Sequence, residues 1–193
     1  MPMGQAIDNS PALWEQKKEL RRLIASLKRE HRATALCRSR EIMERLEHHP
    51  VFQASDTVLL YHSLPDEVNT HEFVERWGGR KQLLLPVVVG DDLELRRYDG
   101  PSSMQVGAYG ILEPVGENFT DYAAIGFVAV PGVAFDARGN RLGRGKGYYD
   151  RLLPRLTAAY KAGICFSFQL LPAIPTAPFD IRMDGIVTER QCW

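Results

Sequence analysis

The chain has 193 residues, of which 45% are hydrophobic and 25% are charged, as in an ordinary globular protein. A chain of this length can bury roughly 70% of its unfolded surface in one compact core. Its 24 acidic and 24 basic residues cancel, which argues against a broad electrostatic surface for nucleic acid or for a membrane. Any anion-binding site must therefore be local.

The cysteine pattern and the apolar segments predict a cytoplasmic protein. The three cysteines form no C-x-x-C pair, so neither a zinc site nor a disulfide framework is indicated. No apolar signal segment precedes the charges that begin at Glu15, and the longest apolar run, residues 83–89, is too short to span a bilayer. We expect one domain over residues 1–193, with residues 1–9 as a loose leader, and we expect a monomer.

The N-terminal quarter of the chain is predicted to be helical. Ser10-Pro11 is typical of a helix start, and leucines recur at helical spacing to about residue 31. A second helix is expected at about residues 33–48, which Pro50 closes. Its buried side is predicted to consist of Leu36, Ile42, Met43 and Leu46.

Short apolar runs then alternate with turn signals. Buried strands are predicted at residues 57–61, 83–89, 93–98, 125–130, 162–168 and 186–188. Pro86 suggests a sheet edge or a bulge. Helices are expected at residues 70–78 and 148–160, and the Gly- and Pro-rich residues 99–118 are expected to form a long functional or covering loop. This order indicates an α/β sheet with both faces covered, in which ligands bind beyond the carboxyl ends of the strands.

A glycine-rich segment, RLGRGKGYYD at residues 141–150, follows one of these strands and opens a helix. Its glycines allow backbone N–H groups to turn toward an anion, and the cations between them supply the counter-charge. The helix start adds unpaired N–H groups and a positive dipole end. The acid that follows can hold a Mg²⁺ ion that bridges phosphates. The residues concerned are Gly143, Arg144, Gly145, Lys146, Gly147, Tyr148, Tyr149 and Asp150.

The spacing of this segment matches neither a Walker A motif nor G-x-G-x-x-G. A flexible turn with solvated basic residues is the alternative interpretation, and the glycines by themselves do not decide between the two. The paired tyrosines and the aspartate directly behind them favour a functional loop, because a solvated turn does not require an aromatic platform.

Residues 141–150 resemble the signature loop of the 5-formyltetrahydrofolate cyclo-ligases, also called 5,10-methenyltetrahydrofolate synthetases, although many bacterial members have a GYGGGYYD form here. Other segments resemble the family's pattern in the same order along the chain. They are Lys17 with Leu20-Arg21, residues 65–68 with Thr70, residues 109–111 with Glu113-Pro114, residues 131–136 with Gly139, and Asp180 with residues 186–189. The resemblance therefore covers nearly the whole chain.

The resemblance implies a three-layer, Rossmann-like and mostly parallel sheet with helices on both faces (NagB/RpiA/CoA-transferase-like). It implies an ATP- and Mg²⁺-dependent cyclisation of 5-formyltetrahydrofolate to 5,10-methenyltetrahydrofolate, with release of ADP and phosphate. The formyl oxygen attacks the γ-phosphate, N10 then attacks the activated carbon, and phosphate leaves. No protein nucleophile, nucleic acid or membrane takes part.

The same resemblance assigns roles to individual residues. The catalytic residues are Arg144, Lys146 and Tyr148. ATP is held by Lys17, Arg21, Arg141, Leu142, Gly143, Arg144, Gly145, Lys146, Gly147, Tyr148 and Tyr149. The folate substrate is held by His62, Glu67, Tyr109, Arg144 and Tyr148, and Mg²⁺ by Asp150 and Asp180.

Several of these assignments have simpler alternatives. Lys18 and Arg22 repeat the spacing of Lys17 and Arg21 one residue later, so the register of the pair is open, and a solvated basic face is the ordinary case. Glu67 fits a surface turn equally well, and so does Asp180. A strand with a buried thiol explains Cys165 better than a nucleophile does.

Three other functions stay open from the sequence. A sugar-phosphate isomerase shares this type of sheet and needs no ATP. A CoA transferase lacks support because its catalytic glutamate context is missing. A non-catalytic nucleotide-binding module that keeps the loop for structure is the third.

Overall fold

The computed structural model describes residues 11–107, 110–177 and 180–192. A six-stranded sheet in the order β11-β9-β6-β1-β2-β3 forms its centre. Its strands are β1 (Thr57–Leu59), β2 (Gln82–Val89), β3 (Asp92–Arg97), β6 (Ile125–Pro131), β9 (Tyr160–Ile164) and β11 (Gly185–Val187). Neighbouring strands are parallel except for the antiparallel pair β2 and β3. The predicted, mostly parallel α/β sheet is therefore confirmed. The predicted leader and the Ser10 cap lie outside the described residues.

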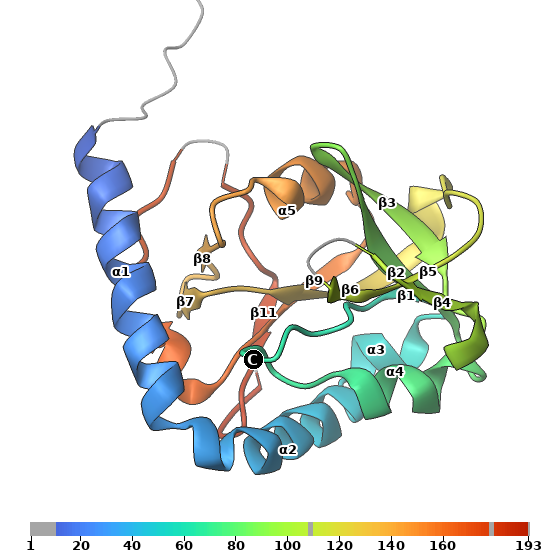
Figure 1. The fold of residues 1–193 in the computed structure, drawn as a ribbon, viewed down its shortest axis with the longest axis horizontal. Helices are drawn as coiled ribbons and strands as arrows, with labels where there is room; N and C mark the ends of the chain where they lie inside the picture. The colour runs from blue at the N-terminus through green and yellow to red at the C-terminus, as the bar shows by residue number, and fades with distance from the viewer. Residues whose placement is uncertain (1–10, 108–109, 178–179, 193) are drawn as a thin grey trace, which may run out of the picture.

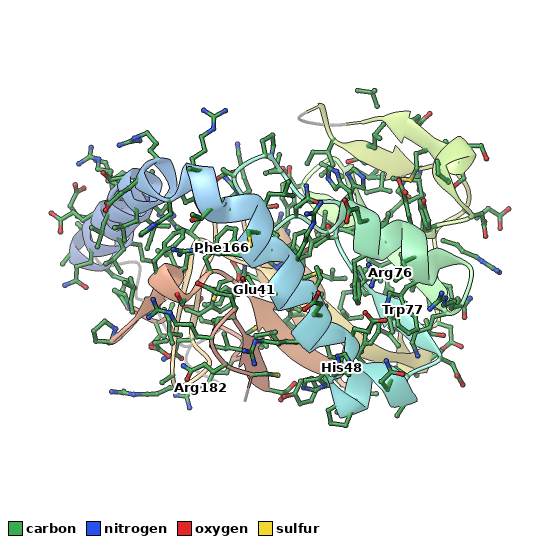
Figure 2. All side chains as sticks on the ribbon, turned by 90° about the horizontal axis from the view of Figure 1, so that it is seen from below. Glu41, His48, Arg76, Trp77, Phe166 and Arg182 are labelled. Atoms are coloured by element: carbon green, nitrogen blue, oxygen red, sulfur yellow. The ribbon has the colours of Figure 1, made fainter. Side chains whose placement is uncertain are left out.

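Helices cover both faces of this sheet (Figure 1). On one face lie α2 (Ala35–Glu47), α3 (Pro50–Ala54) and α4 (His71–Gly78), and on the other lies α5 (Tyr148–Leu152). Figure 2 shows the first face from below, with Glu41 on α2, His48 directly after α2, and Arg76 and Trp77 on the neighbouring helix α4. None of the helices in the described ranges is both long and apolar enough to cross a membrane.

The strands are continuously apolar because alternate side chains enter different cores. Val58 and Phe127 pack in the cluster that includes α2, α3 and α4, whereas Leu59 and Val128 pack in the cluster that includes α5. Successive residues of a strand point to opposite faces, so a sheet covered on both sides needs apolar residues at every position.

A third, smaller core joins α1 (Pro11–Glu30) to a second sheet. Ile24 of α1 is fully buried against Val133, Ala134 and Leu142. The second sheet consists of β10 (Leu170–Leu171), β7 (Ala134–Asp136) and β8 (Arg141–Leu142) in that order. Strands of two or three residues have no periodicity to detect, and none of the three is predicted from the sequence.

The predicted helix at residues 148–160 is wrong in length. Helix α5 ends at Leu152, a 3-10 turn covers Leu153–Arg155, and β9 begins at Tyr160. Pro154 has no N–H to continue an α-helix. The residues from Tyr160 onward form β9, which pairs in parallel with β6.

The predicted second helix also needs two corrections. Leu36 is 53% exposed, although Ile42, Met43 and Leu46 are buried as predicted. Pro50 does not only end a helix; it is the first residue of α3, where its missing N–H costs nothing.

Residues 99–118 contain a β-hairpin rather than an irregular loop. Strand β4 (Met104–Val106) pairs with β5 (Leu112–Pro114), after a 3-10 turn at Pro101–Ser103. The hairpin faces the part of β2 beyond Leu84, where the ladder with β1 has ended. Pro86 lies in the part of β2 that pairs with β3 but not with β1. The predicted edge position therefore holds for this part of the strand, although β3 is the edge strand of the whole sheet.

Candidate active site

A cavity of about 380 Å³ lies beyond the carboxyl ends of β1 and β6. Its wall combines Tyr61 and His62 after β1, Pro131 and Gly132 at the end of β6, and the glycine-rich loop. The segment after β1 adds Leu64 and Glu67, and the remaining wall comes from β2, β3 and the hairpin, through Pro86, Val88, Leu93, Ile111 and Glu113. The glycine-rich loop therefore lies beyond the carboxyl ends of the strands, as the sequence predicts.

The glycine-rich loop runs from β8 into α5. Gly145 and Gly147 have φ values of +97° and +74°, which side chains other than glycine rarely tolerate. Residues 143–150 all line the cavity. Because α5 has only five residues, its dipole contributes less than a full helix would. The helix dipole is therefore a weaker source of positive potential here than the predicted anion site assumed.

Arg141 fixes the inner side of the loop. Its buried guanidinium donates to Asp150 Oδ1 at 2.5 Å and to the carbonyl of Pro131 at 3.3 Å. It also lies over the Tyr149 ring, 5.5 Å from the ring centroid. Arg141 thus ties the strand end, the aromatic residue and the acid together, and leaves the second oxygen of Asp150 for another ligand.

Arg144 reaches across to an acidic turn. Its Nε donates to Glu67 Oε1 at 3.1 Å, and its terminal nitrogen donates to Asp66 Oδ1 at 2.6 Å. Lys28 of α1 donates to the other oxygen of Asp66 at 3.0 Å. Burial by itself would raise the pKa of Asp66, but Lys28 and Arg144 outweigh it and lower that pKa. In this state Arg144 is bound to the turn that contains Glu67.

Helix α1 carries both members of the predicted basic pair, Lys17 and Arg21. Arg21 donates to the carbonyl of Gly143 at 2.9 Å, and Lys17 pairs with Asp180 at 3.0 Å. Lys18, by contrast, contacts Glu15 and Trp14 of its own helix. This arrangement favours the Lys17 and Arg21 register over the alternative one.

Aromatic side chains form the floor beside the loop. Burial raises the pKa values of Tyr61 and Tyr149, so both phenols stay neutral. Tyr148 lies under Arg151, whose guanidinium carbon is 5.6 Å from the ring centroid. His62 stacks on His71 with ring centroids 3.8 Å apart, and burial together with His71 lowers the pKa of His62 to about 4.

The predicted site residues divide into three groups. His62, Glu67, Arg141 and all of residues 143–150 line the cavity. The second group does not line the cavity: Arg21 contacts the loop through Gly143, Lys17 pairs with Asp180, and Leu142 is buried in the core beneath α1. Tyr109 lies outside the described residues. Cys165 is fully buried, and burial raises the pKa of its thiol. Both observations agree with the prediction that Cys165 is a core residue.

The sequence did not single out the apolar wall of the cavity. Four of its residues have the sequence pattern of ordinary strand residues, and no spacing connects them to the loop; they are Tyr61, Pro86, Val88 and Leu93. Glu113 belongs to a segment that resembles the family, but no role was predicted for it. The pairing of β1, β2 and β3 brings the strand residues together, and the packing of the hairpin on β2 adds Glu113.

A metal site built from the protein alone is not present in the described ranges. No group of three or more histidine, cysteine, aspartate or glutamate residues lies together there. Asp150 is the acid at the loop end of the cavity, and Asp180 is held by Lys17. This donor set fits Mg²⁺ only as an ion shared with phosphate oxygens, which is how that ion usually binds.

Comparison with known proteins gives a consistent result. A sequence model of the 5-formyltetrahydrofolate cyclo-ligase family matches residues 13–189. The chain is similar to a probable 5-formyltetrahydrofolate cyclo-ligase of Schizosaccharomyces pombe, with 31% identity over 72% of this chain and 78% of that protein. It is also similar to the 5-formyltetrahydrofolate cyclo-ligase of Mus musculus, with 27% identity over 89% of this chain and 90% of that one.

A solved structure extends the similarity to three dimensions. The 5,10-methenyltetrahydrofolate synthetase of Aquifex aeolicus superposes with a TM-score of 0.79 and 38% identity, over 91% of each chain. The match of the family model to most of the chain, the curated relatives and this fold agree. The chain therefore belongs to the 5-formyltetrahydrofolate cyclo-ligase family.

Proposed function

We propose that the protein is an ATP- and Mg²⁺-dependent ligase that cyclises 5-formyltetrahydrofolate to 5,10-methenyltetrahydrofolate and releases ADP and phosphate. One observation carries the proposal: a single cavity joins a loop of glycines and cations to an apolar, aromatic wall. The first half suits a triphosphate and the second suits a flat ring. The balanced charge and the cysteine pattern support the cytoplasm as its compartment.

The proposed reaction asks the protein for positioning and for charge neutralisation. A formyl oxygen is a poor leaving group, so it first takes the γ-phosphoryl group of ATP. N10 then attacks the activated carbon, the ring closes, and the formyl oxygen leaves within inorganic phosphate. Phosphoryl transfer is accelerated mainly by held geometry and by cations, and no side-chain nucleophile is required.

The cavity supplies groups for each part of this reaction. Lys146 and Arg144 lie where they would neutralise the triphosphate, and Arg21 anchors the loop from α1. Asp150 would hold Mg²⁺ together with phosphate oxygens, and the ion would polarise the γ-phosphate. Tyr148 is proposed to position the folate.

The folate side of the cavity has its own proposed residues. Neutral His62 offers a ring face, and Glu67 is proposed to bind the pterin once Arg144 has moved to phosphate. On the nucleotide side, Asp180, whose carboxylate pairs with Lys17 in the structure, is proposed as the second acid near Mg²⁺.

One assay tests the proposal. The protein is incubated with 5-formyltetrahydrofolate and Mg-ATP, and the absorbance of the methenyl product and the release of ADP are followed together. We expect one ADP per methenyl product, and no product when ATP is omitted or Mg²⁺ is chelated. Absence of folate-dependent ATP consumption would contradict the proposal. It would leave the sugar-phosphate isomerase, the CoA transferase and the non-catalytic binding module to be tested.

A further inference from the structure

Three carboxylates from the described part of the chain line the cavity, and only one of them lacks a cation. Glu67 is paired with Arg144, and Asp150 is paired with Arg141. Glu113 forms no ion pair with any described residue, although it is only 6% exposed. Its neighbours in the wall are apolar side chains of β2, β3 and the hairpin.

The Glu113 carboxylate is held in place from two sides. Its Oε1 accepts the N–H of Val88 at 3.2 Å, on the side of β2 that β1 no longer covers. Its Oε2 lies against Gly107, where an added Cβ would overlap the carboxylate. One N–H is the single hydrogen bond found for this side chain in the described residues. Among the described residues, the carboxylate therefore has fewer hydrogen-bond donors than its lone pairs can accept.

A buried carboxylate without a cation destabilises the fold unless N–H or O–H donors satisfy its lone pairs. A group of this kind in the wall of a ligand cavity is satisfied when the ligand brings the donors. The apolar side chains around it would contact the faces of a flat ring, which leaves the edge of the ring for the carboxylate.

The choice between the two proposed substrates follows from the pattern of donors. The pterin ring of 5-formyltetrahydrofolate presents an N–H and an amino group side by side. Adenine has one amino group with ring acceptors on both sides, and these acceptors would repel a carboxylate. A carboxylate therefore favours the pterin.

We propose that Glu113 is a substrate-binding residue that accepts N–H groups from the pterin of the folate and contributes to the selection of this substrate. The inference rests on the proposed function and adds to it a second pterin-binding acid beside Glu67.

The test is Glu113→Gln, which keeps an oxygen for the Val88 N–H and places an amide NH₂ where the pterin brings its own donors. We expect the KM for 5-formyltetrahydrofolate to rise about 10- to 100-fold, as for loss of hydrogen bonds to a charged group. The KM for ATP should stay at the wild-type value, and the melting temperature should not fall, because a neutral amide is less costly to bury than an unpaired carboxylate. Glu117→Gln, an exposed glutamate four residues later, is the matched control.

A substrate analogue without the pterin amino group separates recognition from structure. The wild type should bind the analogue about tenfold or more weakly than the natural substrate, whereas Glu113→Gln should show a much smaller difference. Gly107→Ala is a second variant that displaces the carboxylate but retains its charge, and it should raise the folate KM selectively.

Equal increases in both KM values, or an analogue that loses as much affinity in Glu113→Gln as in the wild type, would overturn the assignment. Failure of the proposed function would give a different result, because the wild-type protein itself would then form no methenyl product.

Discussion

Lys146 differs from the other cations of the glycine-rich loop. Arg141 and Arg144 are each bound to a carboxylate, whereas Lys146 is exposed and makes no ion pair with a residue in the described ranges. It also lines the cavity. Its charge can reach a phosphate without first breaking an existing pair.

Replacement of Lys146 by alanine should therefore affect catalysis more than stability. We expect kcat to fall by about two to three powers of ten, as for loss of one charge contact in a transition state. Steady-state assays of methenyl formation measure the change. Lys18→Ala, on a side of α1 that contacts Trp14 and Glu15, is the control and should keep normal activity. A Lys146→Ala rate within about threefold of wild type would remove the proposed role.

The stacked pair of His62 and His71 makes a prediction about pH. Burial and His71 lower the pKa of His62 from 6.5 to about 4 in the folded protein. Between these values the unfolded chain binds the extra proton and the native state does not. The contribution of a neutral His62 to stability is thus complete above about pH 6.5 and is lost as the pH falls toward 4.

His62→Gln should reduce this pH dependence. Urea unfolding of both proteins at about pH 7 and about pH 4.5 gives the comparison, and carboxylates common to both cancel in the difference. We expect the variant to lose less of its free energy of unfolding on acidification. The control is His48→Gln, because His48 is exposed at the end of α2. An equal acid sensitivity of His62→Gln and wild type would contradict the assignment.

At the scale of elements, the loop and the acidic turn are held together by a small charge network. Arg144 joins the loop to Asp66 and Glu67, and Lys28 joins α1 to Asp66. If Arg144 neutralises phosphate in the complex, it must first leave these carboxylates. The affinity for ATP is then reduced by the fraction of molecules in which the arginine is held.

Asp66→Asn should weaken that hold. We expect the KM for ATP to fall by about two- to fivefold, a modest effect because exposed ion pairs contribute little. Nucleotide titration and steady-state kinetics both measure it. Asp99→Asn, which breaks an exposed pair with Arg97 in a different part of the chain, should leave the KM for ATP unchanged. An unchanged or higher KM in Asp66→Asn would indicate that Arg144 stays on the acidic turn.

At the scale of the whole molecule, the cavity is an assembly of distant segments. The ends of β1 and β6, the loop, the hairpin and strands β2 and β3 all contribute to its wall, and α1 supports the loop from outside. The two cores on either side of the sheet fix these segments relative to one another. A substitution that changes the packing of either core is therefore expected to change the relative positions of the segments that line the cavity.

The sequence by itself determined the elements with strong patterns and the chemistry of the loop. Helices α1, α2 and α4 and the long strands follow from apolar spacing, because burial on a face imposes a period. The family resemblance identified Lys17, Glu67 and the glycine-rich loop, since such motifs are local in the chain. The helix predicted at residues 148–160 is too long because the apolar residues keep a helical spacing past Pro154. The pairing of β9 with β6 joins residues far apart in the chain, so the local sequence does not indicate it.

Tertiary structure decided what depends on contacts between distant residues. It placed Arg21 on the carbonyl of Gly143, Arg144 on the acidic turn, and Arg141 on Asp150. It also paired β4 with β5, which brings Glu113 to the uncovered side of β2. Hydrogen bonds and ion pairs between segments far apart in the chain leave no periodic trace in the sequence, so only the folded chain reveals them.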